Sequence, residues 1–121
     1  MEINDKTNLY RFGVRNTSKS EAQYIKDNSH RIRTNIIPEN KKLYLTFDID
    51  AFDISLMPAT GTPEPGGLLW DETLNIIRIA AKNSNIVGAD INELAPIKGF
   101  NSYNFLVAKL AYKILSYKFF Y

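Results

Sequence analysis

The stretch LTFDIDAFD, residues 45–53, places three carboxylates, those of Asp48, Asp50 and Asp53, directly after a run of mostly apolar residues. Like charges this close together repel one another, and burying them without a partner costs several kcal/mol. The sequence therefore predicts that a positively charged group lies among these aspartates.

The residues around this stretch show the period of two that is typical of a half-buried strand over residues 42–47. One face of the strand carries Leu43, Leu45, Phe47 and Ile49, and the other carries Tyr44, Thr46, Asp48 and Asp50. Ligands of open α/β sheets bind beyond the carboxyl ends of the strands. Asp90 and Glu93 end the next predicted strand, so we expect these carboxylates to converge with Asp48 and Asp50. Oxygen ligands without cysteine favour Mn²⁺ or Mg²⁺ over a structural zinc.

Strands and helices alternate along the rest of the chain. We expect strands at 8–16, 42–47 and 85–91 (the last one buried), helices at 18–28, 70–83 and 102–120, an irregular segment at 30–42 and a Gly/Pro loop at 55–67. The first helix begins with a capping box, and the last is predicted to be amphipathic. This order predicts a mostly parallel sheet of three strands with helices on its faces. Because both edges of so small a sheet would be open, we expect the chain to be one half of a larger unit.

The composition argues against some classes of function. The 121 residues carry a formal net charge of +2, which gives no electrostatic case for nucleic acid. There is no cysteine, no signal-like start and no apolar run long enough to cross a bilayer. We therefore expect a cytoplasmic globular protein that binds neither nucleic acid nor membranes.

An Asp-x-Asp pair at a strand end has several possible meanings. The pair can simply cap the following loop, or belong to a glycosyltransferase or to a phosphatase of the haloacid dehalogenase type. The phosphatase pattern usually has Thr or Val where this chain has Phe52. The ligand spacing excludes an EF-hand.

The loop that follows resembles the ureohydrolase (arginase/agmatinase) family. TFDIDAFDISLMPATGTPEPGGL, residues 46–68, matches that family in order and spacing, VGADINELAP at 87–96 resembles its next strand, and YRFGVRN at 10–16 resembles a preceding one. The Glu-Pro at 64–65 looks more like agmatinases than arginases. The resemblance implies a three-layer α-β-α fold with a mostly parallel sheet. Residues 1–121 would then be the C-terminal portion of a single ureohydrolase domain.

The resemblance also assigns roles to individual residues. Asp48 and Asp50 would be metal ligands in a binuclear manganese site. Thr62 would hydrogen-bond near the substrate guanidinium, and Glu93 would pair with that group as a planar bidentate partner. We expect structural roles for Asp53 and Asp90, with Thr60 and Gly61 shaping the loop. The only histidine, His30, matches no family ligand and is expected at a helix end.

The chain also departs from the family. Family members are longer, and their other metal ligands come from upstream Gly-Gly-Asp-His and Asp-Ala-His-x-x-Asp segments, which a chain with one histidine cannot contain. Ile54 and Ala59 stand where the family usually has proline and glycine. We therefore expect a truncated or decaying gene or one half of a split enzyme, with the isolated chain a poor catalyst.

The implied reaction is the manganese-dependent hydrolysis of agmatine to putrescine and urea by hydroxide attack on the guanidinium carbon. An alternative within the same class is arginine or guanidinobutyrate as the substrate. From a different class, the chain could be a non-catalytic remnant or an assembly subunit that needs an upstream half-chain. The family suggests a homo-oligomer.

Overall fold

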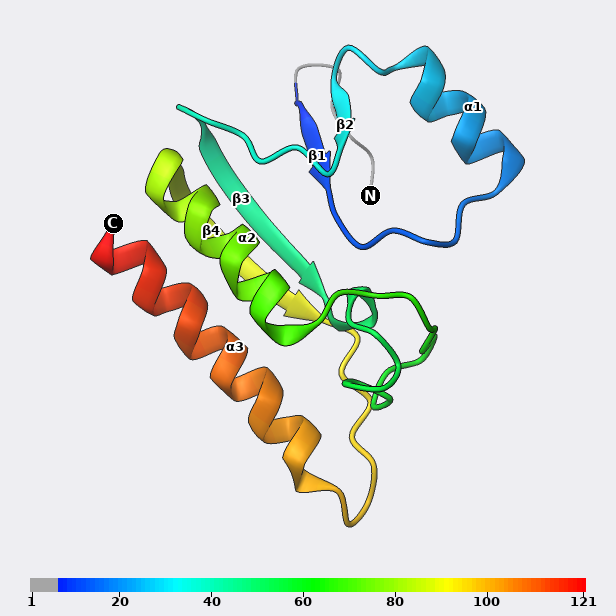
Figure 1. Cartoon of the computed structure of the whole chain (residues 1–121), viewed down its shortest axis with the longest axis vertical. Coiled ribbons are helices and arrows are strands. Elements are labelled where there is room, and N and C mark those ends of the chain that lie inside the picture. The colour runs from blue at the N-terminus through cyan, green and yellow to red at the C-terminus, as the bar shows by residue number, and fades with distance from the viewer. Residues whose placement is uncertain (1–6) are drawn as a thin grey trace.

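The computed structural model describes residues 7–121, in which parallel strands alternate with helices (Figure 1). The elements are β1 (Leu9–Arg11), α1 (Lys19–Asp27), β2 (Ile32–Thr34), β3 (Lys42–Asp48), the 3₁₀ turn η1 (Ile49–Ala51), α2 (Trp70–Asn83), β4 (Asn85–Asn92) and α3 (Asn101–Phe120). The predicted α/β class is thus confirmed. Of the described helices, none combines the length and the apolar character that a membrane crossing requires.

The strands form two separate pairs, and the prediction of one three-stranded sheet is wrong. β1 pairs with β2 and β3 pairs with β4, both in parallel. β2 lies in the segment that we expected to be irregular. Three residues are too few to show a period of two, so only their pairing with β1 defines them as a strand.

The capping box predicted before α1 is confirmed. Ser18 accepts a hydrogen bond from the backbone N–H of Glu21, and the Glu21 carboxylate accepts one from the backbone N–H of Ser18. Two N–H groups that the helix leaves without partners are thereby satisfied. These bonds lower the pKa of Glu21.

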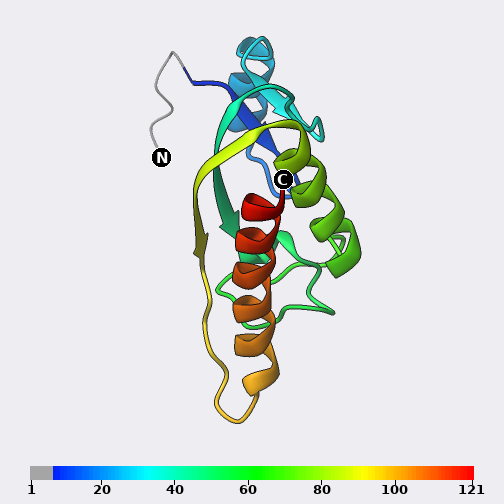
Figure 2. The ribbon, with the colours of Figure 1, turned by 90° about the vertical axis from the view of Figure 1, so that its left-hand side faces the viewer.

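The hydrophobic core lies between β3 and the helices α2 and α3. The alternation predicted for β3 is confirmed, because Phe47 is buried while its neighbours Thr46 and Asp48 are exposed. Figure 2 shows α2 and α3 on the same side of the β3–β4 pair. The core consists of Phe47, Ile49, Phe52, Met57, Ala59, Ile77, Leu110 and Ile114.

The opposite face of the β3–β4 pair is open in the described part of the chain. Tyr44 is 64% exposed and Val87 is 57% exposed. The expectation that residues 85–91 form a buried strand is therefore wrong for one of its two faces. Val87 and Ala89 belong to a surface that nothing in residues 7–121 covers, whereas Ile86 is buried.

Helix α3 is less amphipathic than its sequence suggested. Leu110 and Ile114 are buried as expected, and Leu106 is partly buried. Phe105 and Phe119, however, are 68% and 81% exposed. The helix therefore carries apolar side chains on both its inner and its outer face.

Candidate active site

Asp48 and Asp50 lie at the carboxyl end of β3, joined by a tight turn. β3 ends at Asp48, so the predicted strand alternation does not extend to Asp50. Instead Asp48 caps η1, and its Oδ1 accepts a hydrogen bond of 3.1 Å from the backbone N–H of Asp50. Ile49, fully buried between them, anchors the turn in the core. The two carboxylates are neighbours as predicted, but through a 3₁₀ turn.

The charges around Asp48 favour a bound cation. The pKa of the Asp48 carboxyl is raised, chiefly by its partial desolvation and also by the negative charges of Asp50 and Glu93. No lysine or arginine of the described residues contributes to lowering it. A cation placed here would relieve the repulsion among these three carboxylates.

Thr62 reaches this pair from the long loop between η1 and α2. Its hydroxyl donates a hydrogen bond of 2.7 Å to Oδ2 of Asp50. The proton of the hydroxyl is thus directed at the carboxylate. The lone pairs of the hydroxyl oxygen can accept a hydrogen bond from a further donor. A guanidinium has only donors, so this arrangement is compatible with the predicted contact between Thr62 and the substrate.

Glu93 directly follows β4 and occupies an unusual backbone conformation. Its φ is 69°, in the left-handed region that non-glycine residues rarely adopt. The side chain is exposed, and its charge contributes to the raised pKa of Asp48. Strained conformations of this kind concentrate at binding and catalytic sites. The structure therefore brings Glu93 within electrostatic reach of Asp48.

Asp90 and His30 do not join this group of carboxylates. Asp90 accepts a hydrogen bond of 2.8 Å from Thr46 and another from Asn92, on the open face of the sheet. These bonds lower its pKa, the Thr46 hydroxyl most strongly. His30 is exposed in the turn after α1 ends at Asp27, and its backbone carbonyl accepts a hydrogen bond from Arg33.

Asp53 organises the loop that carries Thr62. Its carboxylate accepts hydrogen bonds from the hydroxyl and N–H of Ser55, at 2.5 and 2.9 Å, and from the N–H groups of Gly66 and Gly67, at 2.6 and 3.1 Å. Gly66 has a φ of +80°, and a Cβ on Gly67 would lie 2.5 Å from the Phe52 carbonyl carbon. The two glycines are therefore required for the chain to return to α2. Asp53 has the structural role that we expected.

We expect the substitution Asp53→Asn to destabilise the chain in a pH-dependent way. Hydrogen bonds, led by that of the Ser55 hydroxyl, lower the pKa of Asp53 to about 2. Because the folded pKa lies below the unfolded value of about 4, the stabilisation is complete above that value and is lost as the pH falls through about 2. Urea unfolding at pH 6 should show a lower midpoint for the variant, and the difference should shrink at pH 2.

The matched control is Asp27→Asn, which changes an exposed carboxylate that accepts a single hydrogen bond, from Gln23, within the described residues and should leave the midpoint unchanged at either pH. Equal midpoints for Asp53→Asn and the parent chain at pH 6 would contradict this role of Asp53.

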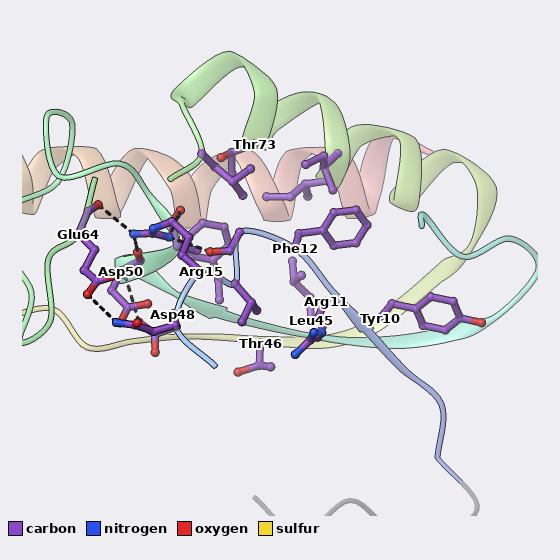
Figure 3. A pocket seen from close by; sticks show the side chains of 18 of the residues that line it. Tyr10, Arg11, Phe12, Arg15, Leu45, Thr46, Asp48, Asp50, Glu64 and Thr73 are labelled. Atoms are coloured by element: carbon purple, nitrogen blue, oxygen red, sulfur yellow. Dashed lines mark hydrogen bonds between the residues drawn. The ribbon is translucent and has the colours of Figure 1, made fainter. Parts of the chain in front are cut away.

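Arg15 is the positively charged group near the aspartates, and the sequence did not single it out. Its guanidinium donates hydrogen bonds to the backbone carbonyls of Gly13, Asp50, Ala51, Phe52 and Glu64, at 2.7 to 3.3 Å. Figure 3 shows it between Asp50 and Glu64. The arginine therefore holds the backbone carbonyls of the aspartate turn, whereas we had expected a positively charged group among the carboxylates themselves. Arg15 closely follows the first strand, just as the acidic turn follows another. This pattern is the sequence signal that could have identified the arginine.

We expect Arg15→Lys to lower the stability of the chain by about 2 kcal/mol, because an ammonium cannot reproduce the planar fork that serves several carbonyls at once. Urea denaturation measures this difference. The control is Arg11→Lys, which removes one exposed bond to Thr34 and should cost far less. Equal losses for the two variants would contradict the anchoring role of Arg15.

The carboxylate oxygens of Asp48 and Asp50 fit part of a metal site. The hydrogen bonds described above use one oxygen of each of Asp48 and Asp50, and both residues lie at a strand end with unbalanced negative charge. Two carboxylates suit a hard divalent cation such as Mn²⁺. No cluster of three or more His, Cys, Asp or Glu suited to a metal occurs among residues 7–121.

Comparisons with known proteins identify the family of this chain. The model of the Arginase family matches residues 1–116. An N(1)-aminopropylagmatine ureohydrolase from Synechocystis is 48% identical over 77 residues, which are 64% of this chain and 25% of that protein. An agmatinase from Bacillus anthracis is 38% identical over 101 residues, covering 74% of this chain and 35% of that protein.

The solved structures share the fold. The arginase from Medicago truncatula superposes with a TM-score of 0.77 at 24% identity, covering 92% of this chain and 39% of that one. The chain thus spans between a quarter and two fifths of the length of these three relatives. With a family match over nearly its whole length and the family's parallel α/β arrangement, this chain belongs to the arginase family.

Proposed function

We propose that this chain forms the part of a manganese-dependent ureohydrolase that supplies two metal-ligand aspartates and the carboxylate that binds the guanidinium. The observation that carries the proposal is that hydrogen bonds join Asp48, Asp50 and Thr62 at the carboxyl end of β3, while Glu93, directly after β4, acts on Asp48 through its charge. In such a site two aspartates bind metal cations, and a separate glutamate binds the planar guanidinium cation. This arrangement suits the hydrolysis of a guanidino compound.

Each residue has a distinct task in this proposal. Glu93 pairs with two N–H groups of the guanidinium and orients its carbon. Thr62 accepts from a third N–H while its own proton holds Asp50 in place. Asp48 and Asp50 bind the metal centre, which when present supplies an activated water for the hydrolysis. The products are urea and the amine that carried the guanidino group.

The proposed substrate is agmatine, and N(1)-aminopropylagmatine is a second candidate. Relatives named agmatinase match 74% of the chain, and the Glu64-Pro65 pair resembles agmatinases. The second candidate is favoured by the 48% identity to a protein with that name. Both compounds present the same guanidinium to Glu93 and differ in what lies beyond it. Arginine and guanidinobutyrate, or a purely assembling role, are the remaining alternatives.

A chimera tests the proposal. This chain replaces the segment that it matches in the Bacillus anthracis agmatinase, so that the remainder of that enzyme provides the other ligands. We expect manganese binding and urea release from agmatine, with aminopropylagmatine, arginine and guanidinobutyrate assayed in parallel. A folded chimera that contains manganese at the parent level but releases no urea from any of the four compounds would contradict the proposed function.

A further inference from the structure

The backbone of Glu64 is fixed beside that of Asp50, one of the two proposed metal ligands. The carbonyl of Glu64 accepts hydrogen bonds from Nη2 of Arg15, at 3.0 Å, and from the N–H of Ile54, at 3.1 Å. The same nitrogen of Arg15 donates to the carbonyl of Asp50 at 2.8 Å. Because one nitrogen atom serves both carbonyls, the two backbones lie side by side, as Figure 3 shows.

The side chain of Glu64 is also held in one orientation. Its Oε1 accepts a hydrogen bond of 2.5 Å from the side-chain amide of Asn16, and the residue is partly buried. Asn16 is neutral, so this bond orients the carboxylate without balancing its charge. The guanidinium of Arg15 donates to backbone carbonyls instead. Among residues 7–121, the carboxylate of Glu64 therefore forms no ion pair, and its Oε2 accepts no hydrogen bond.

This unbalanced charge lies next to the proposed guanidinium site. Glu64 lines the same pocket as Asp48, Asp50 and Thr62, and it follows Thr62 closely along the loop. A partly buried carboxylate is stabilised when a cation pairs with it. The guanidinium itself is already assigned to Thr62 and Glu93. The position of Glu64 therefore suits a second positive charge on the same substrate.

The four candidate substrates differ in the charge at the end away from the guanidinium. Agmatine ends in a primary ammonium, and aminopropylagmatine carries a secondary ammonium at the same position and a further ammonium beyond it. Guanidinobutyrate ends in a carboxylate, and arginine carries a carboxylate next to its ammonium. A fixed carboxylate in the protein attracts the ammonium groups of the first two compounds and repels the carboxylates of the other two.

We propose that Glu64 binds the ammonium group at the far end of an agmatine-type substrate, and that Asn16 is a positioning residue that orients the Glu64 carboxylate. Glu64 then selects guanidino compounds that carry a second positive charge over those that carry a carboxylate. The inference rests on the proposed function for the guanidinium end of the substrate, and it assigns a residue to the opposite end.

Urea assays on the manganese-loaded chimera test the role of Glu64. The substrates are agmatine and n-butylguanidine, which has the same guanidinium but no charge at its far end. Glu64→Gln keeps the length of the side chain and an oxygen that can accept from Asn16. We expect about a tenfold rise in the KM for agmatine and an unchanged KM for n-butylguanidine. Equal changes for the two compounds, or no change for agmatine, would overturn the proposal.

The matched control is Glu39→Gln. It makes the same change of charge on an exposed side chain before β3, at the end of that strand away from Asp48, and both KM values should stay at the parent level. A similar rise in the agmatine KM for Glu39→Gln would show a general effect of charge and overturn the proposal. Glu64→Gln should also keep its manganese, since loss of the metal would place Glu64 in the metal shell instead.

A double-mutant cycle tests the positioning role of Asn16. Asn16→Ala removes the amide that orients Glu64, so we expect about a threefold rise in the KM for agmatine. In the Glu64→Gln background the same change should have no further effect, because the charge that Asn16 orients is already gone. Equal effects of Asn16→Ala in the two backgrounds would show that it acts independently of Glu64 and overturn its positioning role.

Calorimetry on the metal-free chimera separates this inference from the proposed function, because it measures binding without turnover. A preference for agmatine over n-butylguanidine that Glu64→Gln abolishes would support the role of Glu64 even in a chimera that contains manganese but releases no urea, a result that contradicts the function. Urea release with KM values that Glu64→Gln leaves unchanged would contradict the role of Glu64 alone.

Discussion

Replacing both Asp48 and Asp50 with asparagine is expected to abolish manganese binding and urea release together in the chimera. Asparagine keeps the size and one oxygen of each side chain but removes two negative charges from a hard-cation site. Even residues that only support metal ligands cost 10- to 100-fold in affinity or activity when they are changed. The loss of both ligands should therefore exceed about 100-fold in kcat/KM.

The matched control for this change is Asp90→Asn. Asp90 lies on the next strand but is bonded to Thr46 and Asn92 on the open face of the sheet, so the variant should retain its manganese. Metal analysis after gel filtration and a urea assay give both readouts on one sample. The assignment of Asp48 and Asp50 would be wrong if the double variant held as much manganese as the parent.

The second large effect is expected for Glu93→Asp, which should lose about 100-fold in urea release while it keeps its manganese. The substitution preserves the charge but withdraws the carboxylate by one methylene. Catalysis by orientation tolerates a misplacement of this size poorly. Aspartate also tolerates the left-handed backbone conformation better than most residues, so the φ of 69° adds no new strain.

Comparing Glu93→Asp with Glu93→Gln separates the effect of the position of the carboxylate from the effect of its charge. Glutamine keeps the length of the side chain but loses the charge that pairs with a guanidinium. Both variants should raise the KM for agmatine or lower kcat with unchanged metal content. If Glu93→Asp also removed the metal, or left agmatine turnover intact, the division of roles between Glu93 and the aspartates would be wrong.

Features that depend on neighbours in the chain could be predicted from the sequence. The capping box of Ser18 and Glu21 needs only three residues of spacing, and the burial of Phe47 follows from strand alternation. In α2, the buried residues Ile77 and Ala81 follow from helical spacing. Each of these patterns repeats a local geometry, so the residue types alone are sufficient.

Features that depend on distant parts of the chain could not be predicted in this way. β2 is defined only by its pairing with β1, and the role of Arg15 depends chiefly on carbonyls that lie 35 to 49 residues further along the chain. Backbone carbonyls are present in every residue, so a sequence gives no sign of which ones an arginine will reach. The meeting of Asp48 with Glu93 was easier to predict because parallel strands bring their carboxyl ends to one edge.

The most direct test of the central claim is anomalous X-ray diffraction from crystals of the chimera, recorded at the manganese absorption edge. We predict anomalous density within bonding distance of carboxylate oxygens of both Asp48 and Asp50, with Glu93 close by but outside the metal shell. Manganese density elsewhere in the chimera with none at these two aspartates would contradict the claim that this chain supplies metal ligands.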